Sequence, residues 1–254
     1  MAATVSGAEL TAKVISQLPR PFLKWAGGKR WALKTLLPSL ERPGSTYFEP
    51  FLGAGSVFLA LDPSIPRVGG DANTQLIETW TAVRDDLPSL VEELTRFDNS
   101  PETYYEVRAW DRDQENFAGL SPTQRAARLI YLNKTCFNGL YRVNRQGHFN
   151  VPFGDYKNPK FKDTEALQAA SDLLNSTGPS RKDRATLVNS GYIETVGRVG
   201  ENDVVYFDPP YEPLNRTSSF VSYQGAGFNQ EDQRELRDIA VELVRRGARV
   251  VVSN

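Results

Sequence analysis

Four apolar residues in a row, Val204–Phe207, run directly into Asp208, Pro209 and Pro210. A short unbroken apolar run is typical of a strand that is buried on both faces of a parallel sheet. Proline has no backbone N–H and cannot serve the interior of a strand, so the chain must leave the sheet here. The sequence therefore predicts a buried parallel strand that ends in a stiff polar turn.

A second unit of this kind lies nearer the N-terminus. Residues 46–48 are β-prone and lead into the glycines Gly53 and Gly55, after which Val57, Phe58 and Leu61 predict a helical stretch. A glycine turn between a strand and a helix is the start of a βαβ unit. Similar patterns predict strands over 67–70 and 249–252, and helices over 75–83, 123–132 and 230–246. Residues 74–162 break this α/β rhythm and are interpreted as an inserted recognition region.

Composition excludes several classes of protein. The single cysteine, Cys136, and the single histidine, His148, rule out an intramolecular disulfide and a Cys/His zinc cluster. A Ser-His-Asp triad would need His148, which has no nucleophile elbow nearby. No stretch approaches the roughly 20 apolar residues that cross a membrane. We therefore expect no metal, no membrane partner and a cytoplasmic setting, with residues 1–20 a flexible N-terminal extension.

The charge distribution favours nucleic-acid binding, although the net charge is only −1. One basic patch contains a single acid, Asp155, among Arg125, Arg128, Lys134, Arg142, Arg145, Lys157, Lys160 and Lys162. Aromatic residues are interleaved with it, as in nucleic-acid-binding surfaces. A second patch, with no acid, contains Arg20, Lys24, Lys29, Arg30 and Lys34. For one patch alone, ordinary surface charge is an equally good explanation.

Two further segments indicate ligand contacts. The turn at Gly53 and Gly55, with Asp71 at the end of the next expected strand, favours an adenosine-containing ligand, although an ordinary βα turn remains an alternative. Residues 24–29 do not complete a phosphate-binding loop, because Leu23 and Arg30 stand where Gly and Ser or Thr are needed. Their backbone, aromatic ring and ammonium groups suit a zwitterionic or anionic ligand.

The turn at Asp208 carries the most specific chemistry. An aspartate, the rigid carbonyl of Pro209 and the ring of Tyr211 at the end of a strand form a pocket for a flat base with an amino group. The amino N–H groups would donate hydrogen bonds to Asp208 and to the Pro209 carbonyl, and the base would stack on Tyr211. A purely structural turn is the alternative.

Five blocks in sequence carry a family resemblance: residues 21–29, 48–59, 131–134 with 137–144, 147–156 and 208–211. With these blocks in this order, the chain resembles the Dam-type DNA adenine-N6 methyltransferases of the D12 class, which act at GATC. The resemblance implies an α/β fold: a Rossmann-like sheet that binds S-adenosylmethionine, with an inserted, mostly helical DNA-recognition domain and a β-hairpin-type loop. The catalytic domain would comprise 21–73 and 163–254, and the target-recognition domain 74–162.

The resemblance also implies roles for individual residues. The catalytic turn would be Asp208, Pro209, Pro210 and Tyr211. The cofactor would contact Trp25, Ala26, Lys29, Phe51, Gly53, Gly55, Asp71, Tyr192 and Asp208. Double-stranded DNA would contact Lys24, Phe137, Asn138, Leu140, Arg142, Asn144, Asn150, Pro152 and Tyr156. The target adenine would be flipped out of the duplex by a monomeric enzyme.

Two departures from the family pattern stand out. Asp155 occupies a position that is basic in some relatives, and the chain ends after Ser253 and Asn254 where relatives continue with further strands. One sheet edge is therefore expected to be incomplete. Two other functions remain open at this stage: a methyltransferase for RNA or cytosine N4, and a DNA-binding module without catalysis. The biological role, whether repair, regulation, restriction-modification or phage biology, is also open.

Overall fold

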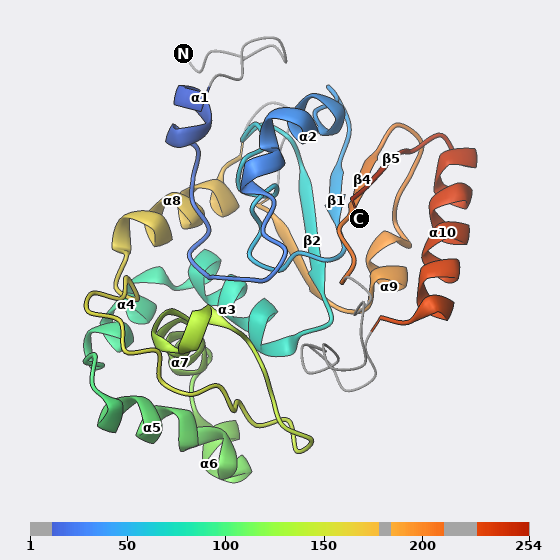
Figure 1. Ribbon diagram of the computed structural model, residues 1–254. Helices are drawn as coiled ribbons and strands as arrows, with labels where there is room; N and C mark the ends of the chain where they lie inside the picture. Colours follow the sequence, from blue (N-terminus) through green and yellow to red (C-terminus); the bar gives the residue numbers. More distant parts are fainter. Residues whose placement is uncertain (1–11, 178–183, 211–227, 254) are drawn as a thin grey trace.

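A computed structural model describes residues 12–177, 184–210 and 228–253 (Figure 1). Its centre is a five-stranded sheet in the order β3-β2-β1-β4-β5, in which every pairing is parallel. The strands are β1 (Tyr47–Glu49), β2 (Arg67–Asp71), β3 (Thr186–Asn189), β4 (Val204–Phe207) and β5 (Arg249–Val252). The strands expected near 46–48, 67–70, 204–207 and 249–252 are confirmed.

The strand order changes direction next to β1. The chain builds outward from β1 to β2 and β3, then crosses back and places β4 on the other side of β1. In open α/β sheets, ligands bind outside the carboxyl ends of the strands at such a switch point. Phe51 follows β1 and Asp208 follows β4, so the topology brings both predicted site residues to this edge.

Some helices, among them α2 and α10, lie against the sheet, and others, among them α4, α5 and α6, gather in a group beside it (Figure 1). The α-helices are α1 (Ala12–Gln17), α2 (Leu33–Leu40), α3 (Thr74–Asp85), α4 (Leu87–Thr95), α5 (Pro101–Ala109), α6 (Gln114–Gly119), α7 (Pro122–Thr135), α8 (Thr164–Asn175), α9 (Tyr192–Val196) and α10 (Gln230–Arg245). The described residues also form short 3-10 helices: η1 (Arg30–Ala32), η2 (Trp110–Arg112) and η3 (Phe137–Gly139). Within the described segments, no helix is long and apolar enough to span a membrane.

Side chains of β4 alternate between two buried clusters, as a strand covered on both faces requires. Val205 and Phe207 pack in the cluster that contains Leu236 and Leu243 of α10. Val204 and Tyr206 belong to the larger cluster, which also contains the core residues of α2. The apolar run is therefore explained by burial on both faces.

Side-chain caps fix where the predicted helices begin. The side chain of Asn229 accepts hydrogen bonds from the backbone N–H groups of Glu231 and Asp232, which starts α10 one residue later. Ser121 caps α7 in a capping box with Gln124. The predicted helices over 75–83, 123–132 and 230–246 are confirmed, with bounds that differ by at most a few residues.

The region from α3 to residue 162 consists of helices followed by a loop that folds back on itself. Val143 and Phe149 form an antiparallel bridge, and the backbone N–H of Asn150 donates to the carbonyl of Arg142 over 3.0 Å. Buried residues of α7 and of β1 belong to one continuous hydrophobic cluster. The division of the chain at residues 74 and 162 therefore remains a prediction, because core packing continues across it.

The prediction of a helical stretch after the glycine turn, at Val57, Phe58 and Leu61, is wrong. Residues 56–60 form hydrogen-bonded turns, with the N–H of Leu59 bonded to the Gly55 carbonyl at 2.9 Å. Every side chain from Val57 to Leu61 is buried. A surface helix needs one polar face, which this segment lacks. The segment instead lies inside the core and forms irregular turns.

Candidate active site

Asp208 lies where β4 leaves the sheet, and two groups hold one of its oxygens. The Lys29 Nζ is 2.7 Å from Asp208 Oδ1, and the Ser253 hydroxyl donates to the same oxygen over 2.7 Å. Lys29 is nearly buried and also donates to the carbonyl of Gly27 over 2.8 Å. Among the contacts of the described residues, both polar partners of Asp208 therefore fall on Oδ1.

Glu49, the last residue of β1, lies in the buried layer beside this pair. The hydroxyl of Tyr47 donates to Glu49 Oε2 over 2.7 Å. Burial is the largest cause that raises the pKa of Glu49 to about 8, and the nearby charge of Asp208 contributes to this rise. Because this pKa exceeds 7, Glu49 carries a proton at neutral pH and adds no second negative charge beside Asp208.

The glycine turn is tied to the acid at the end of β2. Asp71 accepts hydrogen bonds from the backbone N–H of Gly53 over 3.1 Å and from that of Asn73 over 2.9 Å. Gly55 has φ +64°, and a Cβ there would lie 2.6 Å from the ring of Trp80. Gly55 is therefore required by backbone conformation and by space, and the turn holds Asp71 beside it.

Two stacked aromatic pairs flank this turn. Phe51 and Tyr192, which begins α9 after β3, stack with centroids 5.3 Å apart and planes 25° apart. Trp25 stacks on Tyr141 at 5.2 Å and 28°. Burial raises the pKa of Tyr141, whose side chain also forms a hydrogen bond with Asn73. Four aromatic faces thus lie around the acid and glycine turn, and one comes from the basic loop.

A buried asparagine joins the N-terminal segment to the loop. Asn133, fully buried in α7, accepts from the backbone N–H of Lys24 over 2.7 Å and donates to the Lys24 carbonyl over 2.8 Å. The same amide donates to the carbonyl of Gly139 over 3.1 Å. Its three bonds hold η3 against residue 24, so Lys24, a residue of the second basic patch, lies beside the loop of the first patch.

Exposed cationic and aromatic groups gather where these segments meet. The Lys24 Nζ lies 4.2 Å from the centroid of the Tyr156 ring. Phe137 is 51% exposed, and its backbone N–H donates to the carbonyl of Pro152 over 2.9 Å. Asn138 is exposed with φ +55°. The structure thus brings five of the residues predicted to bind DNA into one exposed group.

The remaining predicted DNA residues lie in the folded-back loop. Arg142 donates from Nε to Asn150 Oδ1 over 2.7 Å and from Nη2 to the Asn150 carbonyl over 3.2 Å. Asn144 Oδ1 accepts from the backbone N–H groups of Gln146 and His148, both over 3.0 Å. Asn144 therefore shapes the tip of the loop, and Asn150 orients the guanidinium of Arg142.

A buried ion pair anchors this loop to the helices. Asp111 and Arg128 are 2.7 Å apart and nearly inaccessible, and Asp111 Oδ2 also accepts from the backbone N–H of Phe149 over 2.8 Å. The hydroxyl of Tyr104 donates to the carbonyl of Val151 over 2.8 Å. Because buried groups hold both neighbours of Asn150, Phe149 and Val151, the backbone of Asn150 is fixed, and its side chain can hold Arg142 in one orientation.

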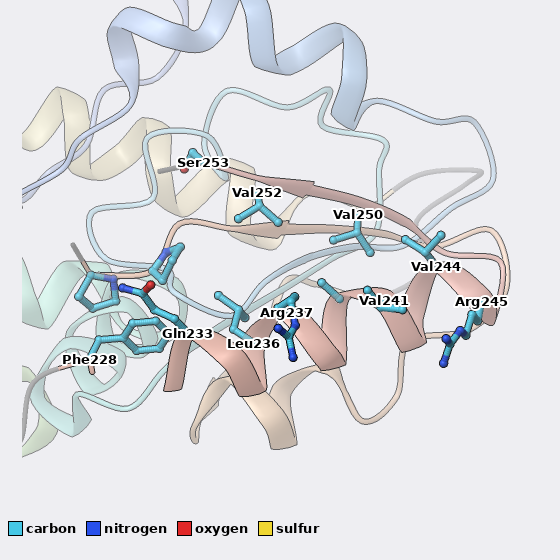
Figure 2. A pocket seen from close by; sticks show the side chains of 13 residues that line it. Phe228, Gln233, Leu236, Arg237, Val241, Val244, Arg245, Val250, Val252 and Ser253 are labelled. Carbon is cyan, nitrogen blue, oxygen red and sulfur yellow. The ribbon is translucent and has the colours of Figure 1, made fainter. Parts of the chain in front are cut away.

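Other predicted residues are less constrained by their surroundings. Ala26 is exposed and Leu140 is partly buried, while Pro209 and Pro210 line a groove between β5 and α10 (Figure 2). Tyr211 lies outside the described residues.

No group of three or more side chains suited to holding a metal occurs in residues 12–177, 184–210 and 228–253.

Sequence reasoning missed four residues of this site. Glu49 is the last residue of β1 and Ser253 directly follows β5, so the rule that ligands bind at strand ends could have indicated both. Asn133 directly follows the apolar stretch 129–132 on the same helix, which is a signal of a buried polar group with a dedicated role. Nothing in the sequence distinguishes Tyr141 from the other aromatic residues of the basic loop.

Comparisons with known proteins identify the family of this chain. A sequence profile described as D12 class N6 adenine-specific DNA methyltransferase matches residues 25–254. The chain is 40% identical over 237 residues to the type II methyltransferase M1.LlaDCHI of Lactococcus lactis subsp. cremoris, with 92% of this chain and 81% of the relative covered. It is 39% identical to the type II methyltransferase M.MjaIII of Methanocaldococcus jannaschii, with 92% and 84% covered.

A third relative is the DNA adenine methylase of Escherichia coli strain K12, which is 38% identical over 239 residues, with 92% of this chain and 80% of the relative covered. The profile match spans the parallel sheet, the helical region with its basic loop, and the turn at Asp208. The chain therefore belongs to the D12 class of N6 adenine-specific DNA methyltransferases.

Proposed function

We propose that this chain transfers a methyl group from S-adenosylmethionine to N6 of an adenine that is flipped out of double-stranded DNA, within the sequence GATC. One observation carries the proposal: Asp208 stands at the sheet's switch point with Oδ1 held by Lys29 and Ser253. An aspartate held in this way can accept a hydrogen bond from an amino group on its other oxygen.

The residues around the glycine turn fit an adenosine-containing cofactor. Asp71 already accepts two backbone hydrogen bonds, and a carboxylate has about four lone-pair sites, so it can also accept from ribose hydroxyls. Phe51 and Tyr192 offer stacked aromatic faces for the adenine. Trp25, Ala26, Lys29, Gly53 and Gly55 complete the proposed cofactor site. When bound, the cofactor supplies a methyl group activated by its sulfonium.

The target base would be held by the turn after β4. The amino group of adenine has a lone pair delocalised into its ring, which makes the nitrogen a poor nucleophile. Hydrogen bonds from this amino group to Asp208 and to the Pro209 carbonyl favour a pyramidal nitrogen with its lone pair directed away from the ring. Pro210 stiffens the turn, and Tyr211 is proposed to stack on the base. Positioning and electrostatics then supply most of the acceleration.

The exposed group around Phe137 is proposed to engage the duplex. Adenine N6 cannot be reached inside a duplex, and flipping costs a few kcal/mol. Phe137, half exposed on a short 3-10 turn, is suited to enter the stack beside the flipped base. Arg142 would bind a guanine through two donors. The proposed contacts to the other bases and to phosphates come from Lys24, Asn138, Leu140, Asn144, Asn150, Pro152 and Tyr156.

The remaining parts of the proposal concern the setting. We propose that the enzyme acts as a monomer on chromosomal or phage DNA in the cytoplasm. The two type II relatives support the proposal of a restriction-modification system as the setting. Growth with and without deletion of a neighbouring nuclease gene tests this: if the methyltransferase becomes dispensable only when the nuclease is absent, it belongs to such a system.

Methyl transfer from labelled S-adenosylmethionine to matched duplexes tests the proposed reaction. One duplex carries a GATC site, the second has that site scrambled, and the third has N6-methyladenine already at the site. We expect label on the first alone. Label on the scrambled duplex as well would retain the reaction and refute the GATC assignment. Label in 4-methylcytosine or in RNA would refute adenine in DNA as the target.

A further inference from the structure

Ser253 and Tyr206 form a chain of hydrogen bonds that ends on Asp208. Ser253 Oγ is 2.7 Å from Asp208 Oδ1 and 2.9 Å from the hydroxyl oxygen of Tyr206. A serine hydroxyl has one hydrogen, and here Ser253 donates it to Asp208. Tyr206 must therefore be the donor in its contact with Ser253, so that polarisation runs from the buried tyrosine toward the carboxylate.

The pairing of β4 with β5 fixes the positions of Tyr206 and Ser253 in this series of hydrogen bonds. Tyr206 is fully buried in β4, and β5 runs parallel to β4 with Val252 opposite Phe207. The backbone N–H of Ser253 then donates to the carbonyl of Phe207 over 2.9 Å, which continues the ladder by one residue. Figure 2 shows Ser253 just past Val252, at one end of the groove between β5 and α10. Its hydroxyl is therefore held beside Asp208 by the backbone.

We propose that Ser253 is a positioning residue for methyl transfer, which holds Asp208 Oδ1 so that Oδ2 is the oxygen presented to the target amino group. This rests on the proposed role of Asp208 as acceptor of the amino N–H. The terminal torsion of an aspartate is broad and two-fold, so an untethered carboxylate samples orientations in which neither oxygen is aimed correctly. Lys29 supplies charge on Oδ1, whereas the hydroxyl supplies a directional bond.

The role predicts a loss in the chemical step and little loss in binding. Ser253→Ala should lower kcat roughly tenfold or more, because a hydrogen bond to a charged group is removed at the reacting centre. KM for DNA and for S-adenosylmethionine should stay within about twofold of the wild type. Ser253→Thr keeps the hydroxyl and should recover most of kcat, and Tyr206→Phe should give an intermediate value.

Ser64→Ala is the matched control, because Ser64 also donates to an aspartate, Asp62, but on the exposed surface. It should leave kcat unchanged. Thermal unfolding of each variant identifies any that fails to fold, and Tyr206→Phe keeps the test available if Ser253→Ala does not fold. A wild-type kcat in folded Ser253→Ala would overturn the inference, and so would a folded Ser253→Thr as slow as the alanine variant. Both leave the proposed function intact, whereas a wild type without methyl transfer would overturn the function itself and this inference with it.

Discussion

The ammonium of Lys29 lies 2.7 Å from Oδ1 of Asp208, although one residue precedes the first strand and the other follows the fourth. The side chain of Lys29 is 6% exposed and that of Asp208 is 18% exposed. The charges are therefore only weakly screened by water, and the pair connects the N-terminal segment to the centre of the sheet. This ion pair makes Lys29 a neighbour of the proposed catalytic aspartate as well as a proposed cofactor residue.

Lys29→Met is expected to reduce both activity and stability. The substitution leaves the Asp208 carboxylate without its cation, and breaking a buried pair by removing one partner costs several kcal/mol. Because Asp208 keeps some contact with solvent, we expect about 1–3 kcal/mol in urea unfolding. The matched test is a double-mutant cycle with Asp208→Asn, in which the lysine should matter less. Strictly additive losses would show that the two groups do not interact.

Glu49 makes stability depend on pH in a defined direction. Its pKa is about 8 in the folded protein, against a usual 4.5. Between these values the folded state holds a proton that the unfolded chain has lost, so stability falls as the pH rises from about 4.5 to about 8. Above pH 8 both states are ionised and this group changes stability no further.

Glu49→Gln should remove that dependence. The amide keeps an acceptor for the Tyr47 hydroxyl and does not titrate. Chemical unfolding at pH 5, 6.5 and 8 should show the wild type losing up to a few kcal/mol relative to the variant. If the two proteins change in parallel over this range, Glu49 is not protonated in the folded state.

The bond between Arg142 and Asn150 predicts linked effects on specificity. Arg142→Ala should cost roughly 1–3 kcal/mol with the cognate site and relax discrimination at one guanine. Asn150→Ala should relax discrimination at the same guanine by a smaller amount, because it frees the guanidinium to rotate. Competition binding with each base replaced in turn measures both. Uniformly weaker binding with unchanged base preference would instead make Arg142 a phosphate contact.

Asn133 is expected to be structural and to control the DNA surface through Lys24. Asn133→Ala leaves the backbone groups of Lys24 and Gly139 without their partners, which should cost roughly 2–4 kcal/mol in unfolding. DNA affinity should also fall, since η3 and residue 24 are no longer held together. Asn158→Ala, at an exposed loop position, is the control and should change neither quantity. Equal effects of the two variants would contradict the role of Asn133.

The sequence was informative where local pattern and burial agree. The run Val204–Phe207 predicted a buried parallel strand because both of its faces are covered, and Asn229 predicted the start of α10 through its side-chain cap. The stretch after Gly55 differs, because its pattern predicts a helix and the chain forms turns there. Its apolar residues fit a helical period, but the segment has no polar face of the kind that a surface helix needs, and all of its side chains from Val57 to Leu61 are buried in the core.

The partners of the site residues could not be predicted, because they depend on distances across the fold. Lys29 was placed near a ligand by its segment, yet its ion pair with Asp208 exists only once β4 lies beside β1. Ser253 reaches Asp208 because β5 pairs with β4 in one particular register. Strand order and register follow from long-range packing, and a single sequence carries no direct signal of either.

The proposed role of Asp208 in methyl transfer is tested most directly by one comparison. The wild type and Asp208→Ala are incubated with the same GATC duplex and S-adenosylmethionine, the DNA is digested to nucleosides, and N6-methyladenine is quantified, with duplex affinity measured in parallel. We predict N6-methyladenine with the wild type and none with the variant, while the affinities for DNA differ by no more than a few fold. Full methylation by a folded Asp208→Ala variant would contradict the central claim.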